Sequence, residues 1–251
     1  MNKQAGSKAV SWLFVAGQDR PKLAQAIDAR PGVLVVDLEE FTPPGEKDAA
    51  CRLFAETAEM CRRRAIGCAI RLDRLARGGE AQLAAIAAAA PDAVFLPQIE
   101  DARQLIELDE LMTRHGLTDG AIVPTIESRQ GLSRLASILT ATSRVRAALL
   151  GSGDLSLDMG IADDPRRMAH LLPLRRRFIE RCRRHGAEAI DGPWPKNIGE
   201  DGFADDCEQS LRAGYRSRCA IAPEQTRYWQ SQNIRTDHTD HNKDYLTPWS
   251  K

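Results

Sequence analysis

The stretch from Val33 to Asp73, VLVVDLEEFTPPGEKDAACRLFAETAEMCRRRAIGCAIRLD, contains two apolar runs separated by one helical segment. The runs Val33–Glu39 and Gly67–Asp73 are almost continuously apolar, a pattern typical of strands that are buried on both faces in a parallel sheet. Between them, Glu46–Arg64 is rich in Ala, Glu, Arg and Leu, and its apolar residues cluster on one helical face. This stretch therefore predicts a strand–helix–strand unit of a parallel sheet.

The same alternation continues through most of the chain. Eight short apolar runs follow one another with starts 22 to 42 residues apart, which leaves room for one helix and two loops in each gap. The runs are Ser11–Gly17, Val33–Glu39, Gly67–Asp73, Asp92–Gln98, Ala121–Ser128, Arg146–Leu155, Glu188–Trp194 and Arg216–Pro223. Eight such units predict an eight-stranded parallel (β/α)8, or TIM, barrel, with a doubly wound open sheet as the alternative.

We expect one barrel domain over residues 9–230 and a polar C-terminal tail over residues 231–251, because the tail lacks any hydrophobic period. Two gaps predict particular helices. Arg129–Thr140 is expected to form a single helix, and Pro165–His185 is expected to be broken or restarted at Pro173.

The composition is that of an ordinary soluble globular enzyme, with 43% hydrophobic and 28% charged residues among 251. Lys plus Arg equals Asp plus Glu at 35 each, so no global field attracts nucleic acid or an anionic membrane. No apolar run approaches the roughly 20 residues of a membrane span, and no signal-peptide core precedes Val10. Six cysteines are too few for a disulfide scaffold, so we expect a reduced, cytoplasmic protein.

Polar side chains gather at the carboxyl ends of the predicted strands, where TIM barrels place their reactive groups. They are Asp37, Glu39, Glu40, Arg71, Asp73, Gln98, Glu100, Glu127, Asp154 and Asp191. Converging carboxylates repel one another, and a hard divalent cation such as Mg²⁺ relieves that repulsion. Glu127 and Asp154 lie on adjacent predicted strands at the same level and are the expected metal ligands; the alternative is that one or both only cap a helix.

Two further features at these strand ends predict substrate contacts. Arg71 interrupts an apolar strand, and its permanently charged fork suits a substrate carboxylate or oxo group, although an ion pair with Asp37 or Glu39 is the alternative. The run Gly151-Ser152-Gly153 directly follows a strand, where free backbone N–H groups can hold a carboxylate. A tight turn alone would also favour these glycines.

Five segments, in this order, resemble the motifs of one family. They are Ser11–Gly17 with Lys22-Leu23 (similar to LFVPG…KL), Val36–Pro44 with Lys47 (LDLEDxVPPxxK), Phe95–Glu100 (LPKVE), Pro124–Ser128 with Gly131-Leu132 followed by Leu150–Leu155 (PLIETxxGL…GxxDL), and Ala189–Pro193 (AIDGV). Together they resemble the citrate lyase β-subunit-like group of the HpcH/HpaI aldolase and citrate lyase superfamily.

The resemblance implies a TIM barrel with Mg²⁺ held by Glu127 and Asp154, and with Arg71 on the substrate's oxo or carboxylate group. It places Asp37 and Glu39 near the site, and leaves the general base among these two and a metal-bound water. Family reactions make or break a carbon–carbon bond beside a carbonyl, in small hydroxy or oxo acids or in acyl-CoA thioesters. Members are homo-oligomers, often trimers or hexamers.

The chain departs from the family pattern at four points. Asp73 replaces the amide of RVN, Gln98 replaces the lysine of LPKVE, and Ala222 replaces the histidine of IHP. A polar tail stands where family enzymes that act on CoA thioesters carry a lid. Two functions therefore stay open: a Mg²⁺-dependent carbon–carbon lyase or aldolase, and a diverged non-catalytic barrel that binds an oxo acid or a protein partner.

Three weaker signals are expected to be structural. The cysteines match no zinc spacing and are expected to be buried and reduced. His238 and His241 lie in the tail and are expected to bind no metal. Arg175–Arg177 with Arg181, Arg183 and Arg184 are expected to form the solvated basic face of an amphipathic helix.

Overall fold

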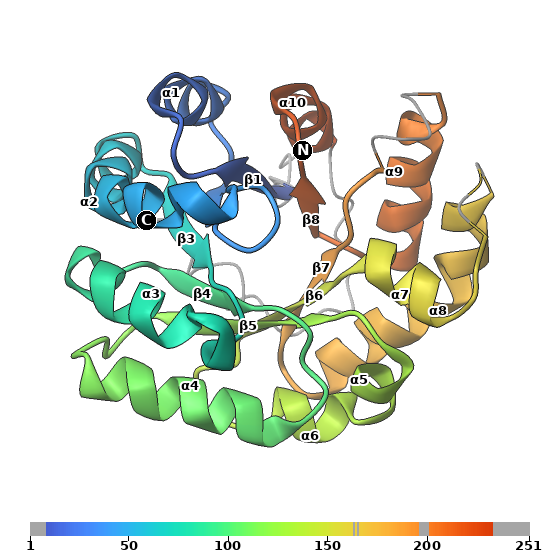
Figure 1. The fold of residues 1–251 in the computed structure, drawn as a ribbon. Coiled ribbons are helices and arrows are strands. Elements are labelled where there is room, and N and C mark those ends of the chain that lie inside the picture. The colour runs from blue at the N-terminus through green and yellow to red at the C-terminus, as the bar shows by residue number, and fades with distance from the viewer. Residues whose placement is uncertain (1–8, 163, 165, 196–200, 233–251) are drawn as a thin grey trace, which may run out of the picture.

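The computed structural model describes residues 9–162, 164, 166–195 and 201–232. Within these residues, eight parallel strands pair in chain order and close into a barrel (Figure 1). The strands are β1 (Val10–Ala16), β2 (Val33–Asp37), β3 (Gly67–Arg71), β4 (Ala93–Leu96), β5 (Ala121–Ile126), β6 (Ala147–Leu150), β7 (Glu188–Asp191) and β8 (Ser217–Ala220). The predicted TIM barrel is confirmed, and the open-sheet alternative is excluded because β1 pairs with both β2 and β8.

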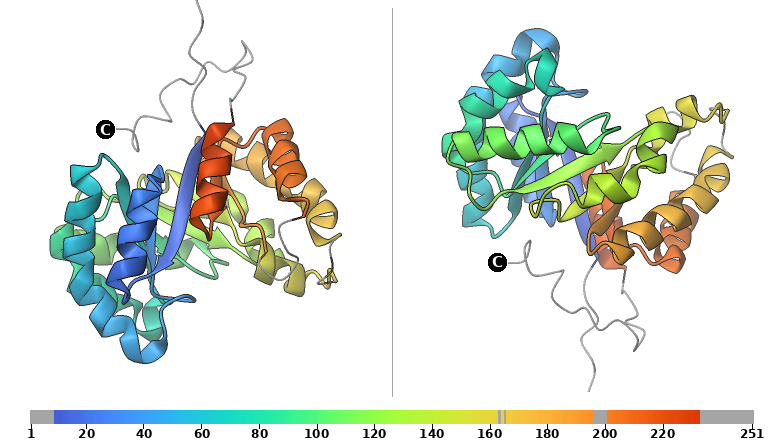
Figure 2. Two further views of the ribbon diagram at one scale, coloured as in Figure 1. Left: turned by 90° about the horizontal axis from the view of Figure 1, so that it is seen from above. Right: turned by 90° about the horizontal axis from the view of Figure 1, so that it is seen from below.

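Helices form a ring outside the strands. They are α1 (Arg20–Asp28), α2 (Lys47–Arg63), α3 (Gly79–Ile86), α4 (Ala102–Arg114), α5 (Arg129–Ser133), α6 (Leu135–Leu139), α7 (Ser152–Asp158), α8 (Arg167–Arg184), α9 (Phe203–Ala213) and α10 (Pro223–Ser231), with the 3₁₀ turns η1 (Pro44–Glu46), η2 (Leu75–Arg77) and η3 (Ala87–Ala89). Figure 2 shows α1 and α10 on either side of β1. The indole N–H of Trp229 in α10 donates to the Val10 carbonyl over 2.9 Å, which joins the last described helix to the first strand.

Successive side chains along each strand point to opposite faces of the barrel wall, so the apolar residues form two separate cores. One lies between the strands and the helices, and the other fills the barrel interior, where Phe95 contacts Trp12 and Phe14 edge to face at centroid distances of 5.5 and 5.3 Å. Among the described residues the barrel interior is therefore packed with side chains, and TIM barrels bind their ligands at the carboxyl ends of the strands.

Three predicted elements differ from those observed. The run Arg146–Leu155 ends as a strand at Leu150, and its last residues begin α7. The single helix expected over Arg129–Thr140 is two short helices, α5 and α6. Pro173 does not break α8, because it lies on the exposed face, where the carbonyl of Ala169 that loses its N–H partner can bind water.

The expected solvated face of α8 is wrong at Arg175. This side chain is fully buried in an ionic network of four residues: Arg175, Asp191, Asp206 and Arg218. Arg175 donates to Asp191 from Nε over 3.0 Å and to Asp206 from Nη1 over 2.6 Å, and Arg218 bonds Asp206. Burial opposes ionisation of Asp191, but Arg175 and Arg218 outweigh burial and lower the pKa of its carboxyl. The network joins the end of β7 and the first half of β8 to α8 and α9.

All six cysteines are buried and none forms a disulfide, as expected. Burial raises the pKa of the Cys51 and Cys207 thiols to about 11, and it also raises those of Cys182 and Cys219. Residues 233–251 of the predicted tail, with His238 and His241, lie outside the described residues. No helix in the described ranges combines the length and apolar character needed to cross a membrane.

Candidate active site

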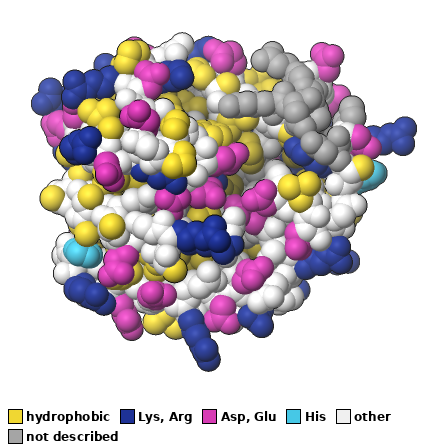
Figure 3. All heavy atoms as spheres, in the orientation of Figure 1, with side chains coloured by type: hydrophobic (Ala, Val, Ile, Leu, Met, Phe, Trp, Pro, Cys, Tyr) yellow, Lys and Arg dark blue, Asp and Glu magenta, His cyan; other side chains and the backbone are white. Residues whose placement is uncertain are grey.

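A cavity of about 540 Å³ opens at the carboxyl ends of the strands. Acidic side chains gather around this hollow on the face seen in Figure 3. The lining residues are Phe14, Glu39, Glu40, Phe41, Arg71, Thr125, Glu127, Leu149, Gly151, Ser152, Gly153, Asp154, Arg167, Pro193, Trp194, Pro195, Cys219 and Ile221. Of the residues predicted to bind the metal, contact the substrate or take part in catalysis, all except Asp37 are among them.

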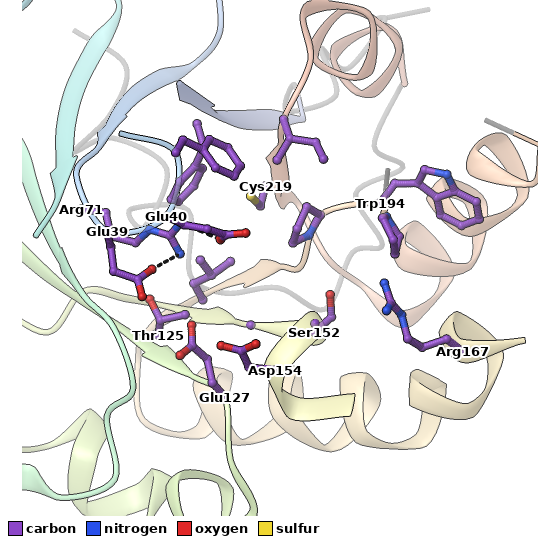
Figure 4. Close-up of a pocket in the computed structure, with 18 residues that line it drawn as sticks. Glu39, Glu40, Arg71, Thr125, Glu127, Ser152, Asp154, Arg167, Trp194 and Cys219 are labelled. Carbon is purple, nitrogen blue, oxygen red and sulfur yellow. Dashed lines mark hydrogen bonds and ion pairs between the residues drawn. The ribbon is translucent and has the colours of Figure 1, made fainter. Parts of the chain in front are cut away.

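Arg71 is fixed in one orientation by Asp37. The two residues end β3 and β2 and are register partners, so their side chains lie side by side. Arg71 donates from Nε and Nη2 to the two Asp37 oxygens over 2.7 and 2.6 Å, and from Nη2 to Glu40 over 3.1 Å. Its Nη1 lies 3.3 Å from Glu39, and Arg71 lines the cavity (Figure 4). The ion pair expected as the alternative for Arg71 is therefore present, and its contact with a substrate stays a prediction.

Asp37 lies beneath the cavity and does not line it. The carboxylate is fully buried and also accepts the backbone N–H groups of Glu39, Glu40 and Phe41 over 3.0, 3.4 and 3.1 Å. These bonds and those from Arg71 occupy its oxygens. Asp37 therefore holds Arg71 and the following loop in place, and neither of its oxygens is left for a substrate.

Glu39 lines the cavity beside Arg71. Burial raises the pKa of its carboxyl, Arg71 opposes that rise, and the charges of Asp37, Glu40 and Asp154 add to it. Glu39 is thus a carboxylate at the cavity surface that holds a proton more readily than an ordinary glutamate.

Glu127 follows β5 and is only 9% exposed. Its Oε2 accepts the backbone N–H of Gln98 over 3.2 Å, which is possible because Gln98 adopts a left-handed conformation with φ of 55°. Burial, together with the charges of Glu39 and Asp154, raises the pKa of Glu127 to about 8 despite the opposing effect of Arg71. This raised pKa favours the protonated form of Glu127 at neutral pH when no metal is bound.

Asp154 comes from the first turn of α7, not from a strand. Figure 4 shows the carboxylates of Glu127 and Asp154 side by side and directed into the cavity. The short loop after β6 makes this possible, since Leu150 pairs with Ile126 at the ends of β6 and β5. Ser152 and Gly153, whose backbone N–H groups have no acceptor within the helix, both line the cavity.

Among the lining residues that were not predicted, Thr125 and Arg167 carry polar groups of interest. Thr125 is fully buried, and within the described part of the chain its Oγ1 has no hydrogen-bond partner. Strand alternation gave a signal for it, since it precedes Glu127 by two residues and so shares its face. Arg167 opens α8 and places a second guanidinium at the cavity. No local pattern pointed to it, because its proximity to the site depends on how α8 folds back.

Three acids of the predicted ring lie elsewhere. Asp73 bonds the Lys47 ammonium over 2.7 Å and also accepts from Gln82. Glu100 accepts the Ser128 hydroxyl over 2.7 Å, and Asp191 belongs to the buried ionic network. Asp73, which stands where the family motif has an amide, therefore contacts residues behind the cavity and does not line it.

The lining fits a divalent cation. Four carboxylates and two arginines line the cavity, so its formal charge is two negative when all are ionised. Among the described residues no cluster of three or more ligating side chains occurs, and the two adjacent carboxylates of Glu127 and Asp154 match the one or two that Mg²⁺ usually takes from a protein. The unpartnered hydroxyl of Thr125 is a further polar group that a bound ligand or water would satisfy.

Gly151→Ala is expected to weaken Mg²⁺ binding at least about tenfold with little loss of stability, because only glycine leaves room for Glu127. A Cβ at position 151 would lie 2.3 Å from Glu127 Cγ and 2.9 Å from its Oε1. Calorimetric titration of Mg²⁺ measures the effect. Gly153→Ala is the matched control, since nothing lies within 4 Å of its added Cβ. Equal Mg²⁺ affinity in the two variants would contradict this account.

The metal-free protein is expected to lose stability as pH rises from about 5 to 8. Folded Glu127 keeps its proton up to a pKa of about 8, whereas the unfolded side chain releases it near 4.5. The folded state thus binds more protons in this window, and the free energy of unfolding falls by about 1 kcal/mol per pH unit. Urea unfolding in a chelator should show this fall in the wild type. Glu127→Gln, which cannot titrate, should show a smaller one; an identical pH dependence would refute the raised pKa.

Residues 10–223 match the family described as HpcH/HpaI aldolase/citrate lyase. The chain belongs to this family. Among curated relatives, (3S)-malyl-CoA thioesterase of Cereibacter sphaeroides is 28% identical over 219 residues, 86% of this chain and 73% of that protein. Citrate lyase subunit beta of Haemophilus influenzae is 25% identical over 222 residues, 86% of this chain and 76% of that protein. The predicted membership of a citrate lyase β-like group is confirmed.

Two solved structures share the fold. RipC from Yersinia pestis superposes with a TM-score of 0.74 at 25% identity and covers 91% of this chain and 96% of its own. The citrate lyase beta subunit from M. tuberculosis, complexed with oxaloacetate and magnesium, gives 0.73 at 22% identity and covers 89% and 96%. The second likeness shows the fold alone.

Proposed function

We propose that this member of the HpcH/HpaI family is a Mg²⁺-dependent carbon–carbon lyase or aldolase. Its substrate is a small hydroxy or oxo acid, or the acyl-CoA thioester of one. The observation that supports this most is the pair of adjacent carboxylates, Glu127 and Asp154, facing the fixed guanidinium of Arg71 in one cavity.

Each group has a defined task in this proposal. Glu127 and Asp154 would hold Mg²⁺, which supplies Lewis-acid stabilisation of the oxygen that becomes negative when the bond beside the carbonyl breaks. Arg71 donates from Nη1 to that oxygen, and Asp37 keeps the guanidinium in place before the substrate arrives. The N–H groups of Ser152 and Gly153 bind a substrate carboxylate.

Glu39 is the residue that exchanges a proton with the substrate in this proposal. It lines the cavity, whereas Asp37 lies beneath it with its oxygens already bonded. Burial raises the pKa of Glu39, which brings this carboxyl nearer to the operating pH of a general acid or base. Of the two acids predicted near the site, only Glu39 is therefore placed to exchange a proton with a substrate.

A second reaction, hydrolysis of the thioester, is suggested by the relatives named thioesterases. It would use the same pair of metal ligands but produce a free acid with its carbon skeleton intact.

Assembly as a trimer or hexamer stays a prediction from the family resemblance.

Calorimetric titration of Mg²⁺ into metal-free protein, with and without oxaloacetate, pyruvate or glyoxylate, tests the proposal. We expect Mg²⁺ and an oxo acid to strengthen each other's binding by the same factor, since ligands that share a site are coupled reciprocally. Mass analysis of products from a hydroxyacyl-CoA then separates cleavage from hydrolysis. Absence of Mg²⁺ binding under every condition would overturn the proposal in favour of the non-catalytic barrel.

A further inference from the structure

Thr125 lines the cavity, but its hydroxyl has no part in the proposed reaction. The side chain is fully buried, and among the residues that the structure describes its Oγ1 has no hydrogen-bond partner. Figure 4 shows Thr125 between Arg71 and Glu127. A buried hydroxyl without a partner destabilises a protein, so its presence at a cavity points to a ligand group that bonds it.

The floor of the cavity surrounds Thr125 with apolar side chains. Side chains alternate along β5, so Thr125 points the same way as Val123, which belongs to the core inside the barrel. Three other members of that interior core also line the cavity: Phe14, Leu149 and Cys219. A protonated cysteine behaves as a small apolar residue. The Thr125 hydroxyl is therefore a polar group set in an apolar floor.

Threonine at this position is a feature of this chain. The motif PLIET, which Pro124–Ser128 resembles, has leucine where this chain has Thr125. A leucine would continue the apolar floor, whereas threonine has a shorter side chain and adds one donor and two acceptor positions. The exchange of leucine for threonine thus gives the floor both more room and a hydrogen-bonding group.

A neutral hydroxyl on the substrate suits this floor better than a charged group. A charge at the floor would lose its water and gain only one hydrogen bond, which makes its burial unfavourable. A hydroxyl loses less on leaving water, and it can either donate to the Thr125 oxygen or accept from it. The floor therefore favours a small, uncharged substituent that carries a hydroxyl.

We propose that Thr125 is a specificity-determining residue that hydrogen-bonds a hydroxyl substituent on the substrate carbon beside the oxo group. This inference rests on the proposed function, in which Arg71 and the metal ligands hold the oxo oxygen and the start of α7 binds the carboxylate. The substituent on the neighbouring carbon is then the part of the substrate free to reach the floor. A chain with leucine at this position would show no such preference.

The test compares hydroxypyruvate with pyruvate, which differ by one hydroxyl, by calorimetry in the presence of Mg²⁺. The wild type should bind hydroxypyruvate about tenfold more tightly, the gain of one buried hydrogen bond. In Thr125→Val, which keeps the branched shape and removes the hydroxyl, the ratio of affinities should fall to near one. Thr125→Ser keeps the hydroxyl and should retain most of the preference.

Thr226→Val is the matched control. The Thr226 hydroxyl is also fully buried and has no partner within the described ranges, but it lies in α10 and does not line the cavity. This variant should leave the ratio unchanged, and a thermal melt verifies that each variant is folded.

Three results would overturn the inference. The first is a wild-type ratio of one, and the second is an unchanged ratio in Thr125→Val. The third is an equal loss of affinity for both acids in that variant, which would assign the hydroxyl to a group that the two acids share. Failure of the proposed function looks different, because Mg²⁺ would then strengthen the binding of neither acid to the wild type.

Discussion

Asp154→Asn is expected to weaken Mg²⁺ binding at least about 100-fold and to remove any Mg²⁺-dependent turnover, since it takes away one of two protein ligands. The fold should survive. Asp154 is exposed on the first turn of a short helix, and its carboxylate points into the cavity and not into a core. Calorimetry measures the metal affinity, and a thermal melt in chelator verifies that the variant is folded.

Asp158→Asn is the control for this prediction. Asp158 lies on the same helix and undergoes the same change of charge, but it pairs with Arg129 outside the cavity. Its variant should bind Mg²⁺ within about twofold of wild type, because screened surface charges have small effects. Full Mg²⁺ affinity in Asp154→Asn would remove this residue from the metal site.

Asp191→Ala is expected to lower the free energy of unfolding by about 3–5 kcal/mol, the cost of leaving a buried charge without its partner. Asp191 is fully buried and bonds Arg175, and its Oδ2 also accepts the Ser210 hydroxyl over 2.6 Å. Because its folded pKa is lowered below 3.8, the stabilisation is present at neutral pH and is lost only in acid. Urea unfolding at pH 7 measures the loss.

Glu208→Ala in α9 is the matched control for Asp191→Ala. Glu208 also forms an ion pair, with Arg212 over 2.6 Å, but both side chains are largely exposed. Its removal should cost no more than about 0.5 kcal/mol. Similar destabilisation by the two variants would show that the buried ionic network contributes no more than a surface pair.

The strands of this barrel could be predicted because they are short, apolar and buried on both faces, as between Val33 and Asp37. Helix α7 could not, because seven residues are too few to show a helical period after an apolar run. Asp154 was therefore placed on a strand, although the prediction that it lies beside Glu127 was right. The expectation that site residues lie at strand ends located both carboxylates. Glu127 directly follows β5, and α7, which carries Asp154, begins shortly after β6 ends.

Predictions from the sequence were wrong or missing for residues whose contacts lie far away along the chain. Arg175 bonds residues 16 and 31 positions away, so its exposed basic neighbours suggested a solvated position that Arg175 itself does not have. Arg167 reaches the cavity only because α8 packs back onto the strands. Gln98 adopts a left-handed conformation and its N–H donates to Glu127, and neither residue type signals this arrangement.

The six buried cysteines have a practical consequence for measuring how this barrel opens. A thiol reacts with alkylating reagents as its thiolate, and burial disfavours the thiolate of Cys51 and Cys207 by raising their pKa to about 11. Native molecules should therefore stay unlabelled at neutral pH, whereas an opened chain exposes thiols of ordinary reactivity. The mass added over time then reports the rate of opening, from the chain's own side chains and without any introduced probe.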